Sequence, residues 1–233
     1  MKRILAAILL TLGAAAGFGA SDFFVKGEAL FIQNKPQDAR PLLESALNDD
    51  PSNEKTYLYL GIIYQQLGDT QKAIDILKRG LDISTAYKEL FYYNMGNDLY
   101  ARKDFAGAEQ MYTSSVAVKK DLAESYLNRA NARLQQQNQD GALADYAYFL
   151  QLAPMDPQRP NIEKLMALLR KVQDQKEVDR QAALAQQEAE KARQQALLKD
   201  VLNSLNNAGD STKNLSVESI NGQTDPVNVD IKD

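Results

Sequence analysis

The sequence predicts an all-α protein, a right-handed solenoid of four antiparallel helix pairs, because one residue pattern returns four times. Four alanines are spaced by 34, 35 and 34 residues: Ala39, Ala73, Ala108 and Ala142. Small residues with the same spacing lie upstream of them: Gly27, Gly61, Gly96 and Ala130. Aromatic residues precede these by four positions: Phe23, Tyr57, Tyr92 and Tyr126.

The spacing within each unit indicates two helices that pack closely against each other. A small residue on the first helix allows the second helix to approach, and the alanine on the second helix meets it. One pair cannot bury its own apolar side, so successive pairs must stack.

The chain opens with a segment that is typical of a secretory signal peptide. Met1, Lys2 and Arg3 form a basic start, and residues 4–20 follow without a charge. We therefore expect residues 1–20 to be a signal peptide that is cleaved near Ala20 or Ser21. The alternative is an uncleaved membrane anchor, for which 17 apolar residues are marginal in length.

The repeated residues resemble the tetratricopeptide repeat (TPR) family. The second unit carries its consensus best, through Tyr57, Leu60, Gly61, Tyr64, Ala73 and Leu77. The first unit contributes Gly27, Leu30, Ala39, Leu43, Ala46 and Pro51. The third keeps Tyr92, Met95, Gly96, Leu99, Ala108 and Tyr112, and the fourth keeps Tyr126, Ala142, Tyr146 and Pro154. The resemblance implies four TPR units at about residues 20–53, 54–88, 89–122 and 123–156.

Two departures from the family pattern stand out. Arg129 and Arg133 replace apolar residues in the fourth unit, and one residue is inserted near 85–89. These departures put the packing of the fourth unit in question.

Beyond the repeats, residues 157–172 read as a capping helix opened by Pro160. Its apolar stripe consists of Ile162, Leu165, Met166, Leu169 and Val172. Residues 173–206 contain no Gly or Pro and predict a long polar helix. Residues 207–233 predict a disordered tail, although the alternation of Val227, Val229 and Ile231 would also suit a strand added to a partner's sheet.

Composition excludes most catalytic chemistry, so an enzyme is not expected. The chain has no Cys, no His and no Trp, which removes disulfides, thiolate or imidazole metal sites and the common nucleophile pairs. It shows no Gly-rich phosphate loop and no calcium loop, so no cofactor or metal is expected. A net charge of −4 provides no attraction for nucleic acid.

The resemblance implies a concave face lined by the first helix of each unit, which binds protein segments. Mapped onto this sequence, the peptide-binding groove receives Phe24, Glu28, Phe31, Leu58, Ile62, Gln65, Tyr93, Asn97, Tyr100, Leu127, Asn131 and Leu134. Asn97 and Asn131 lie one unit apart, and their amides suit the backbone of a bound peptide. The alternative is that both are ordinary solvated positions.

The resemblance also implies an absence. TPR domains that capture a C-terminal carboxylate use basic residues on this face, but the corresponding positions hold Phe24, Leu58, Tyr93 and Leu127. The groove is therefore expected to prefer apolar ligand side chains.

A dense apolar stripe ends the long helix: Leu197, Leu198, Val201, Leu202 and Leu205. Such a stripe is usually covered, here by a second subunit, a partner or the protein's own groove. Upstream, small residues from Val178 to Ala196 recur at heptad spacing, which suits either a weak coiled coil or a solvated helix.

Together these features predict a non-enzymatic adaptor that binds proteins in the bacterial cell envelope. The expected location is the periplasm, with secretion or inner-membrane anchoring as alternatives. The envelope role rests on analogy with exported TPR proteins. The alternative function is a homo-oligomeric structural envelope protein whose C-terminal helix mediates self-association. A third hypothesis is an enzyme that uses carboxylates alone.

Overall fold

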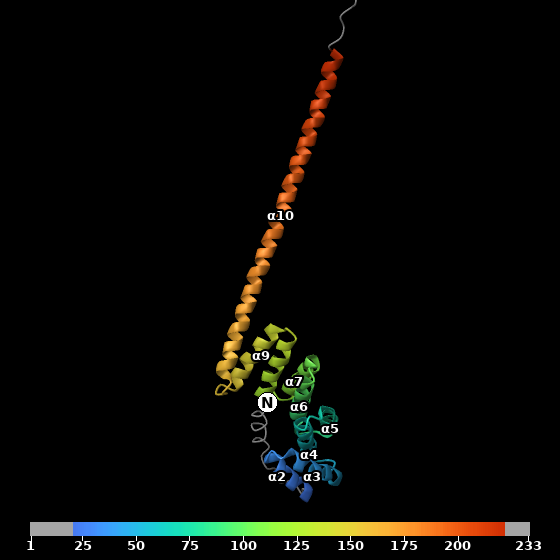
Figure 1. Ribbon diagram of the computed structural model, residues 1–233, viewed down its shortest axis with the longest axis vertical. Coiled ribbons are helices and arrows are strands. Elements are labelled where there is room, and N and C mark those ends of the chain that lie inside the picture. The colour runs from blue at the N-terminus through green and yellow to red at the C-terminus, as the bar shows by residue number, and fades with distance from the viewer. Residues whose placement is uncertain (1–20, 222–233) are drawn as a thin grey trace, which may run out of the picture. The chain divides into compact units, whose positions relative to one another are not determined.

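The computed structural model describes residues 21–221, and within this range it is helical with no strand (Figure 1). The helices are α2 (Asp22–Ile32), α3 (Pro36–Asp49), α4 (Glu54–Gln66), α5 (Thr70–Ile83), α6 (Lys88–Ala101), α7 (Phe105–Val118), α8 (Ala123–Gln135), α9 (Gln139–Leu152) and α10 (Arg159–Asn221). The first eight form the pairs α2/α3, α4/α5, α6/α7 and α8/α9. The predicted all-α solenoid of four helix pairs is thereby confirmed.

Close contact between the two helices of a unit has the predicted cause. A Cβ atom added at Gly61 would overlap the side chain of Leu77, which lies on the second helix of that unit. The equivalent Cβ at Gly27 would lie 2.7 Å from Leu43 Cγ, and at Gly96 it would lie 2.6 Å from Tyr112 Cε1. The glycines therefore serve packing, because any side chain there would push the paired helices apart.

The turn between the two helices of each unit repeats as faithfully as the helices do. One residue of this turn adopts a left-handed backbone conformation in each of the four units: Asn34 (φ 57°), Gly68 (φ 82°), Lys103 (φ 64°) and Gln137 (φ 62°). In the last three units the second helix then begins with a side-chain cap from Asp69, Asp104 or Asn138.

The inserted residue near 85–89 is accommodated by one carboxylate. Glu54 accepts hydrogen bonds from Ser84 Oγ (2.6 Å), Thr85 N (2.8 Å), Thr85 Oγ1 (2.8 Å) and Ala86 N (3.2 Å). Partial burial raises the pKa of Glu54, but these donors outweigh it and leave the pKa below its ordinary value. The turn with the inserted residue is thus held by the first residue of α4.

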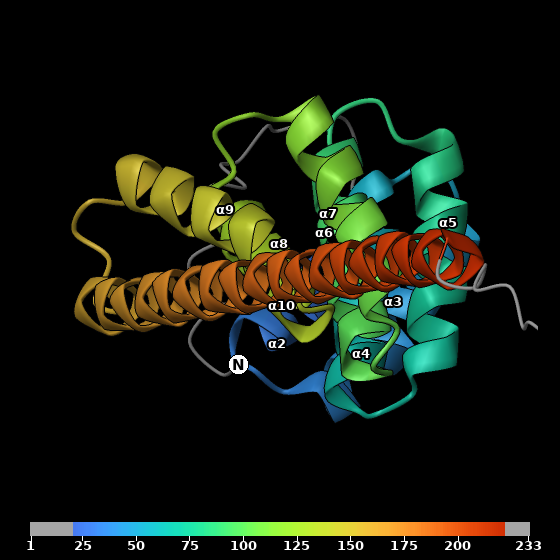
Figure 2. The same cartoon turned by 90° about the horizontal axis from the view of Figure 1, so that it is seen from above.

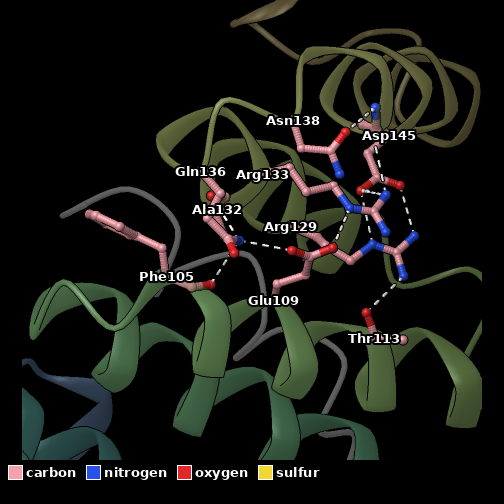
Figure 3. Close-up of polar contacts among 10 residues, drawn as sticks. Phe105, Glu109, Thr113, Arg129, Ala132, Arg133, Gln136, Asn138 and Asp145 are labelled. Carbon is pink, nitrogen blue, oxygen red and sulfur yellow. Dashed lines mark hydrogen bonds and ion pairs between the residues drawn. The ribbon is translucent and has the colours of Figure 1, made fainter.

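The two arginines of the fourth unit pack through an ionic cluster in place of apolar contacts (Figure 3). Arg129 Nη2 lies 2.7 Å from Asp145 Oδ1, and Arg133 Nη1 lies 2.7 Å from Asp145 Oδ2. Arg133 Nε also pairs with Glu109 Oε1 of the third unit at 2.7 Å. The side chain of Asp145 is only 5% exposed, so this cluster belongs to the interior between the third and fourth units.

A second buried carboxyl group lies between the second and third units, and it is not paired. Asp98 on α6 is 0% exposed, and neither of its oxygens accepts a well-formed hydrogen bond from the described residues. Burial raises its pKa to about 7, even though Gln65 and Arg102 nearby act to lower it. The corresponding residues of the second and fourth units are the buried Ile63 and Ala132.

The predicted cap is present at the start of α10. Ile162, Met166 and Leu169 are buried in one cluster with unit-four residues such as Tyr146 and Phe149. The chain divides into two units after Leu169, so the remainder of α10 is described by itself.

The predicted boundary between a long helix and a disordered tail at residue 207 is wrong for the part that is described. α10 is one helix from Arg159 to Asn221 (Figure 2). Residues 207–221 hold one glycine and no proline. Extending an existing helix costs far less than nucleating one, so these polar residues continue it.

Two predictions fall outside the described residues. These are the signal peptide at residues 1–20 and the strand-like segment from Val227 to Ile231. Among the helices that are described, none combines the length and apolar character needed to cross a membrane.

Candidate protein-binding face

Half of the predicted groove residues do not line an accessible surface. Six of the apolar ones are less than 9% exposed and belong to the two hydrophobic cores: Phe24, Phe31, Leu58, Ile62, Tyr93 and Leu127. Tyr59 shows why, since its ring packs 4.6 Å from Phe31 and 6.1 Å from Phe24 between centroids. Neighbouring helices cover these positions, and the prediction of an apolar groove wall is corrected accordingly.

The other six predicted residues remain partly accessible, and four of them are polar. We call this set the amide face: Glu28, Gln65, Asn97, Tyr100, Asn131 and Leu134. All lie on the first helices of the four units. Glu28, Asn97 and Asn131 occupy the same repeat position, whose counterpart in the second unit is Ile62.

The two asparagines are fixed in the same way. The Tyr112 hydroxyl donates to Asn97 Oδ1 at 2.9 Å, and the Tyr146 hydroxyl donates to Asn131 Oδ1 at 2.6 Å. Each tyrosine lies on the second helix of the same unit, 15 residues further on. The sequence pattern contained both tyrosines but gave no sign that they orient these amides.

Burial sets the protonation state of both tyrosines. Burial raises the pKa of Tyr112 well above its usual range and that of Tyr146 to about 12, so both hydroxyls are protonated donors at neutral pH. Each asparagine accepts this hydrogen bond with its oxygen and keeps its NH2 group for other partners.

Asn97 is held by a further residue that sequence reasoning missed. Asn128 Nδ2 donates to Asn97 Oδ1 at 2.9 Å and to the Tyr93 hydroxyl at 3.2 Å. Asn97 itself lies within hydrogen-bonding reach of Tyr93, which can take one of its two N–H groups. One N–H of Asn97 then remains for a ligand.

Glu28 marks the other end of the amide face. The Tyr59 hydroxyl donates to Glu28 Oε1 at 2.8 Å, and burial together with this carboxylate raises the pKa of Tyr59 far above its usual range. The face thus changes from a carboxylate in the first unit to amide donors in the third and fourth units.

The positions that a carboxylate clamp would need carry no cation in this structure. Phe24, Leu58, Tyr93 and Leu127 are all buried. Within residues 21–221 there is also no cluster of three or more Asp, Glu, His or Cys side chains that could hold a metal ion.

The stripe near the end of α10 is exposed on the helix that carries it. Exposure is between 48% and 65% for its five residues: Leu197, Leu198, Val201, Leu202 and Leu205. Further upstream, Val178 and Leu184 are exposed as well. The stripe is therefore an apolar surface on this separate unit of the chain.

Comparison with known proteins assigns the family. Residues 30–88 and residues 93–159 each match a family model of the tetratricopeptide repeat. The chain belongs to the tetratricopeptide repeat family. Stacked repeats of this kind form extended surfaces that bind other proteins.

The curated relatives match this chain over only a small part of their own length. The DnaJ homolog subfamily C member 7 homolog of Schizosaccharomyces pombe is 27% identical in an alignment of 138 positions that covers 52% of this chain and 29% of that protein. Tetratricopeptide repeat protein 16 of Homo sapiens is 30% identical in an alignment of 146 positions that covers 60% of this chain and 16% of that protein. The chain thus spans less than a third of either relative.

Solved structures show the same fold. MamA from Desulfovibrio magneticus RS-1 matches with a TM-score of 0.55 at 17% identity, covering 67% of this chain and 94% of that one. The pilF protein of Pseudomonas aeruginosa matches with a TM-score of 0.57 at 19% identity, covering 66% and 68%. At this level of identity the likeness concerns the fold alone.

Proposed function

We propose that the protein is a non-enzymatic adaptor that holds protein segments on the amide face. The observation that carries this proposal is the pair of oriented amides, Asn97 and Asn131, one repeat apart. A tyrosine hydroxyl occupies the oxygen of each, at 2.9 and 2.6 Å, so each presents N–H donors. Main-chain carbonyl groups are acceptors that every protein segment carries, and they match this chemistry.

The rest of the amide face adds selectivity. Tyr100, whose ring packs 5.2 Å from that of Phe105, and Leu134 lie beside the amides and can contact apolar side chains of the ligand. Glu28 adds a negative charge at the first unit. The segment that fits is one with free carbonyl groups over the third and fourth units and no acidic residue near the first.

The cell envelope is the proposed place of action. Its support is the basic start and the uncharged run of residues 4–20, which is typical of export with cleavage. Periplasmic fractionation and an N-terminus near Ala20 or Ser21 are the expected results. A native N-terminus at Met1, with membrane association that resists carbonate, favours the retained anchor.

The binding proposal is tested by photochemical or chemical crosslinking in the native host, followed by capture. Changing Asn97 and Asn131 together to Ala is expected to reduce partner recovery several-fold, because two hydrogen bonds of about 0.5–1.5 kcal/mol each are lost. The matched control is Asn48→Ala with Asn161→Ala, two exposed asparagines away from the face. Equal recovery with all three proteins, at unchanged helical content, would refute the role of the amides.

Self-association through α10 is the second candidate, favoured by the exposed stripe from Leu197 to Leu205. Leu198→Asp with Leu202→Asp should reduce the mass measured by light scattering from dimer to monomer if the stripe joins two copies. Gln194→Asp with Gln195→Asp is the matched control, since it adds the same charge beside the stripe. A monomeric wild type that loses partner capture only in the leucine variant assigns the stripe to a partner instead.

A further inference from the structure

The first helix of every later unit buries one side under the unit before it. On α4 this side is formed by Thr56, Tyr59 and Ile63, all at most 2% exposed. On α6 it is formed by Phe91, Asn94 and Asp98, all at most 6% exposed. The same repeat positions on α2 are Asp22, Val25 and Ala29.

On α2 this side is bare. Val25 is 55% exposed, Ile32 two turns further along is 62% exposed, and Ala29 between them is exposed as well. No described residue covers them, whereas the opposite end of the repeats is closed by Ile162, Met166 and Leu169 of α10. We call Val25, Ala29 and Ile32 the α2 face. The ends of a stacked array normally carry polar caps, so an apolar end needs an occupant.

We infer that the occupant is a second copy of this chain, with two α2 helices packed antiparallel about a two-fold axis at Ala29. Such an axis places Val25 of one copy opposite Ile32 of the other, and Ile32 opposite Val25. The small Ala29 lies at the crossing point, where close approach of two helices requires a small side chain. The order large, small, large is thus complementary to itself, as an isologous interface demands.

Charge at the ends of the α2 face supports the same arrangement. Asp22 is exposed before the face, and Lys35 is exposed in the turn after α2. The antiparallel arrangement brings Asp22 of each copy toward Lys35 of the other, whereas a parallel pair would place like charges together. Asp22 and Lys26 form an exposed ion pair at 3.7 Å within one helix, which can rearrange at little cost.

The size of the α2 face predicts a weak dimer. Stable interfaces bury roughly 1,200–2,000 Å² in total, and one short helix from each copy provides less. Association should therefore depend on protein concentration. This inference rests on α2 and is independent of the amide face and of the α10 stripe.

Cysteine substitution tests this interface without interference, because the chain contains no cysteine of its own. The variants are made in the full-length gene and purified from the native host. Ala29→Cys is expected to form a disulfide-linked dimer on mild oxidation, since the two thiols meet at the axis. Ala117→Cys, an exposed helical alanine on α7, is the matched control and should remain monomeric. Equal crosslinking of both variants would overturn the proposal.

Charge exchange tests the direction of packing. Asp22→Lys and Lys35→Asp alone should each weaken the dimer several-fold in sedimentation velocity, and the double variant should restore it. Val25→Asp with Ile32→Asp should abolish it, while Val118→Asp, which alters an exposed valine on α7, should not. Absence of rescue, or a wild type that is monomeric at every concentration, would overturn the proposal.

A photoreactive residue identifies the occupant directly. With p-benzoylphenylalanine in place of Ile32, irradiation is expected to join the chain to α2 of another copy. Attachment to residues 4–20 of the same chain, or to a different protein, would replace the second copy with that occupant and refute the inference. Dimerisation that survives Val25→Asp with Ile32→Asp but is lost in the Leu198 and Leu202 variant would assign self-association to α10 alone.

Discussion

The two internal boundaries of the later repeats each bury an aspartate, and they treat it in opposite ways. Between the third and fourth units, Asp145 is met by Arg129 and Arg133, each at 2.7 Å. Between the second and third units, Asp98 is more deeply buried, and no side chain among residues 21–221 gives it a well-formed hydrogen bond. Asp98 lies on the first helix of its unit and Asp145 on the second helix of its own, and the two carboxyl groups also differ in their partners.

This comparison shows how much the partners of a buried carboxyl group decide what its burial costs. At Asp145 two guanidinium groups compensate the lost water, and burial, which by itself lowers the pKa of Arg129, is outweighed by Asp145 so that this pKa is raised. At Asp98, Gln65 and Arg102 offset burial only in part, and the carboxyl group keeps its proton up to a pKa of about 7. One boundary is therefore sensitive to loss of a partner, and the other is sensitive to pH.

Removing Asp145 should have the largest effect. Asp145→Ala leaves Arg129 and Arg133 without their shared partner and is expected to lower the free energy of unfolding by about 3–5 kcal/mol. Urea denaturation followed by circular dichroism measures this change.

The matched control replaces the three members of the cluster in the fourth unit by the residues of the second unit, as Arg129→Leu, Arg133→Tyr and Asp145→Ile. Its stability should lie near that of the wild type, since an apolar replacement of a buried ion pair is often neutral. A small effect of Asp145→Ala alone would show that the cluster is solvated and not part of the interior.

Asp98 should impose a penalty that grows with pH. Its folded-state pKa of about 7 lies above the ordinary value of 3.8, so ionisation opposes folding. The protein should lose stability relative to Asp98→Asn as the pH rises from about 4 to about 7, by up to about 4 kcal/mol at pH 8. Urea midpoints at a series of pH values provide the measurement.

Asp82→Asn, at an exposed position on α5, controls for the general effect of removing a negative charge. Parallel stability curves for the wild type and Asp98→Asn would contradict the account of the second boundary.

A change in the apolar contact between α4 and α5 should lower the free energy of unfolding by an intermediate amount. Gly61→Leu would force its side chain against Leu77 and is expected to cost about 1–3 kcal/mol through overpacking. A melting temperature equal to that of the wild type would mean that α4 and α5 can separate freely, and the close approach of paired helices would lose its importance.

The smallest effect is expected at Glu54, which titrates in the opposite sense to Asp98. Its lowered pKa means that its contribution is present above pH 4.5 and is lost as the pH falls through the folded-state value. Glu54→Gln should cost about 1 kcal/mol at pH 7, and this cost should shrink as the pH falls below 4.5. An effect that persists unchanged in acid would show that the charge of Glu54 is irrelevant to the turn.

Much of the fold could be predicted because the same residue types recur at the same positions of each repeat. Glycine and alanine at fixed spacing predicted the helix pairs, and Pro160 with its apolar stripe predicted the cap. The ionic cluster could not be predicted in full. Arg129 and Arg133 were visible as departures, but Glu109 and Asp145 lie on other helices, and sequence spacing does not say which side chains meet.

The candidate site was predicted less well than the fold. Repeat position assigns a residue to a helix face but does not give its depth, and six apolar residues assigned to an open groove are buried. The burial of Asp98 could have been predicted, since its carboxylate occupies the repeat position of the apolar residues Ile63 and Ala132. The bare side of α2 could be seen only after the burial of the equivalent residues on α4 and α6 was known.

The central claim is that Asn97 and Asn131 present oriented amide donors to a bound protein segment. The most direct test is nuclear magnetic resonance of their side-chain NH2 groups, assigned with the single alanine variants, during titration with a synthetic copy of the segment captured in the native host. Both NH2 signals are expected to shift while that of the exposed Asn48 remains in place. A segment that binds and leaves the signals of Asn97 and Asn131 unchanged would contradict the account.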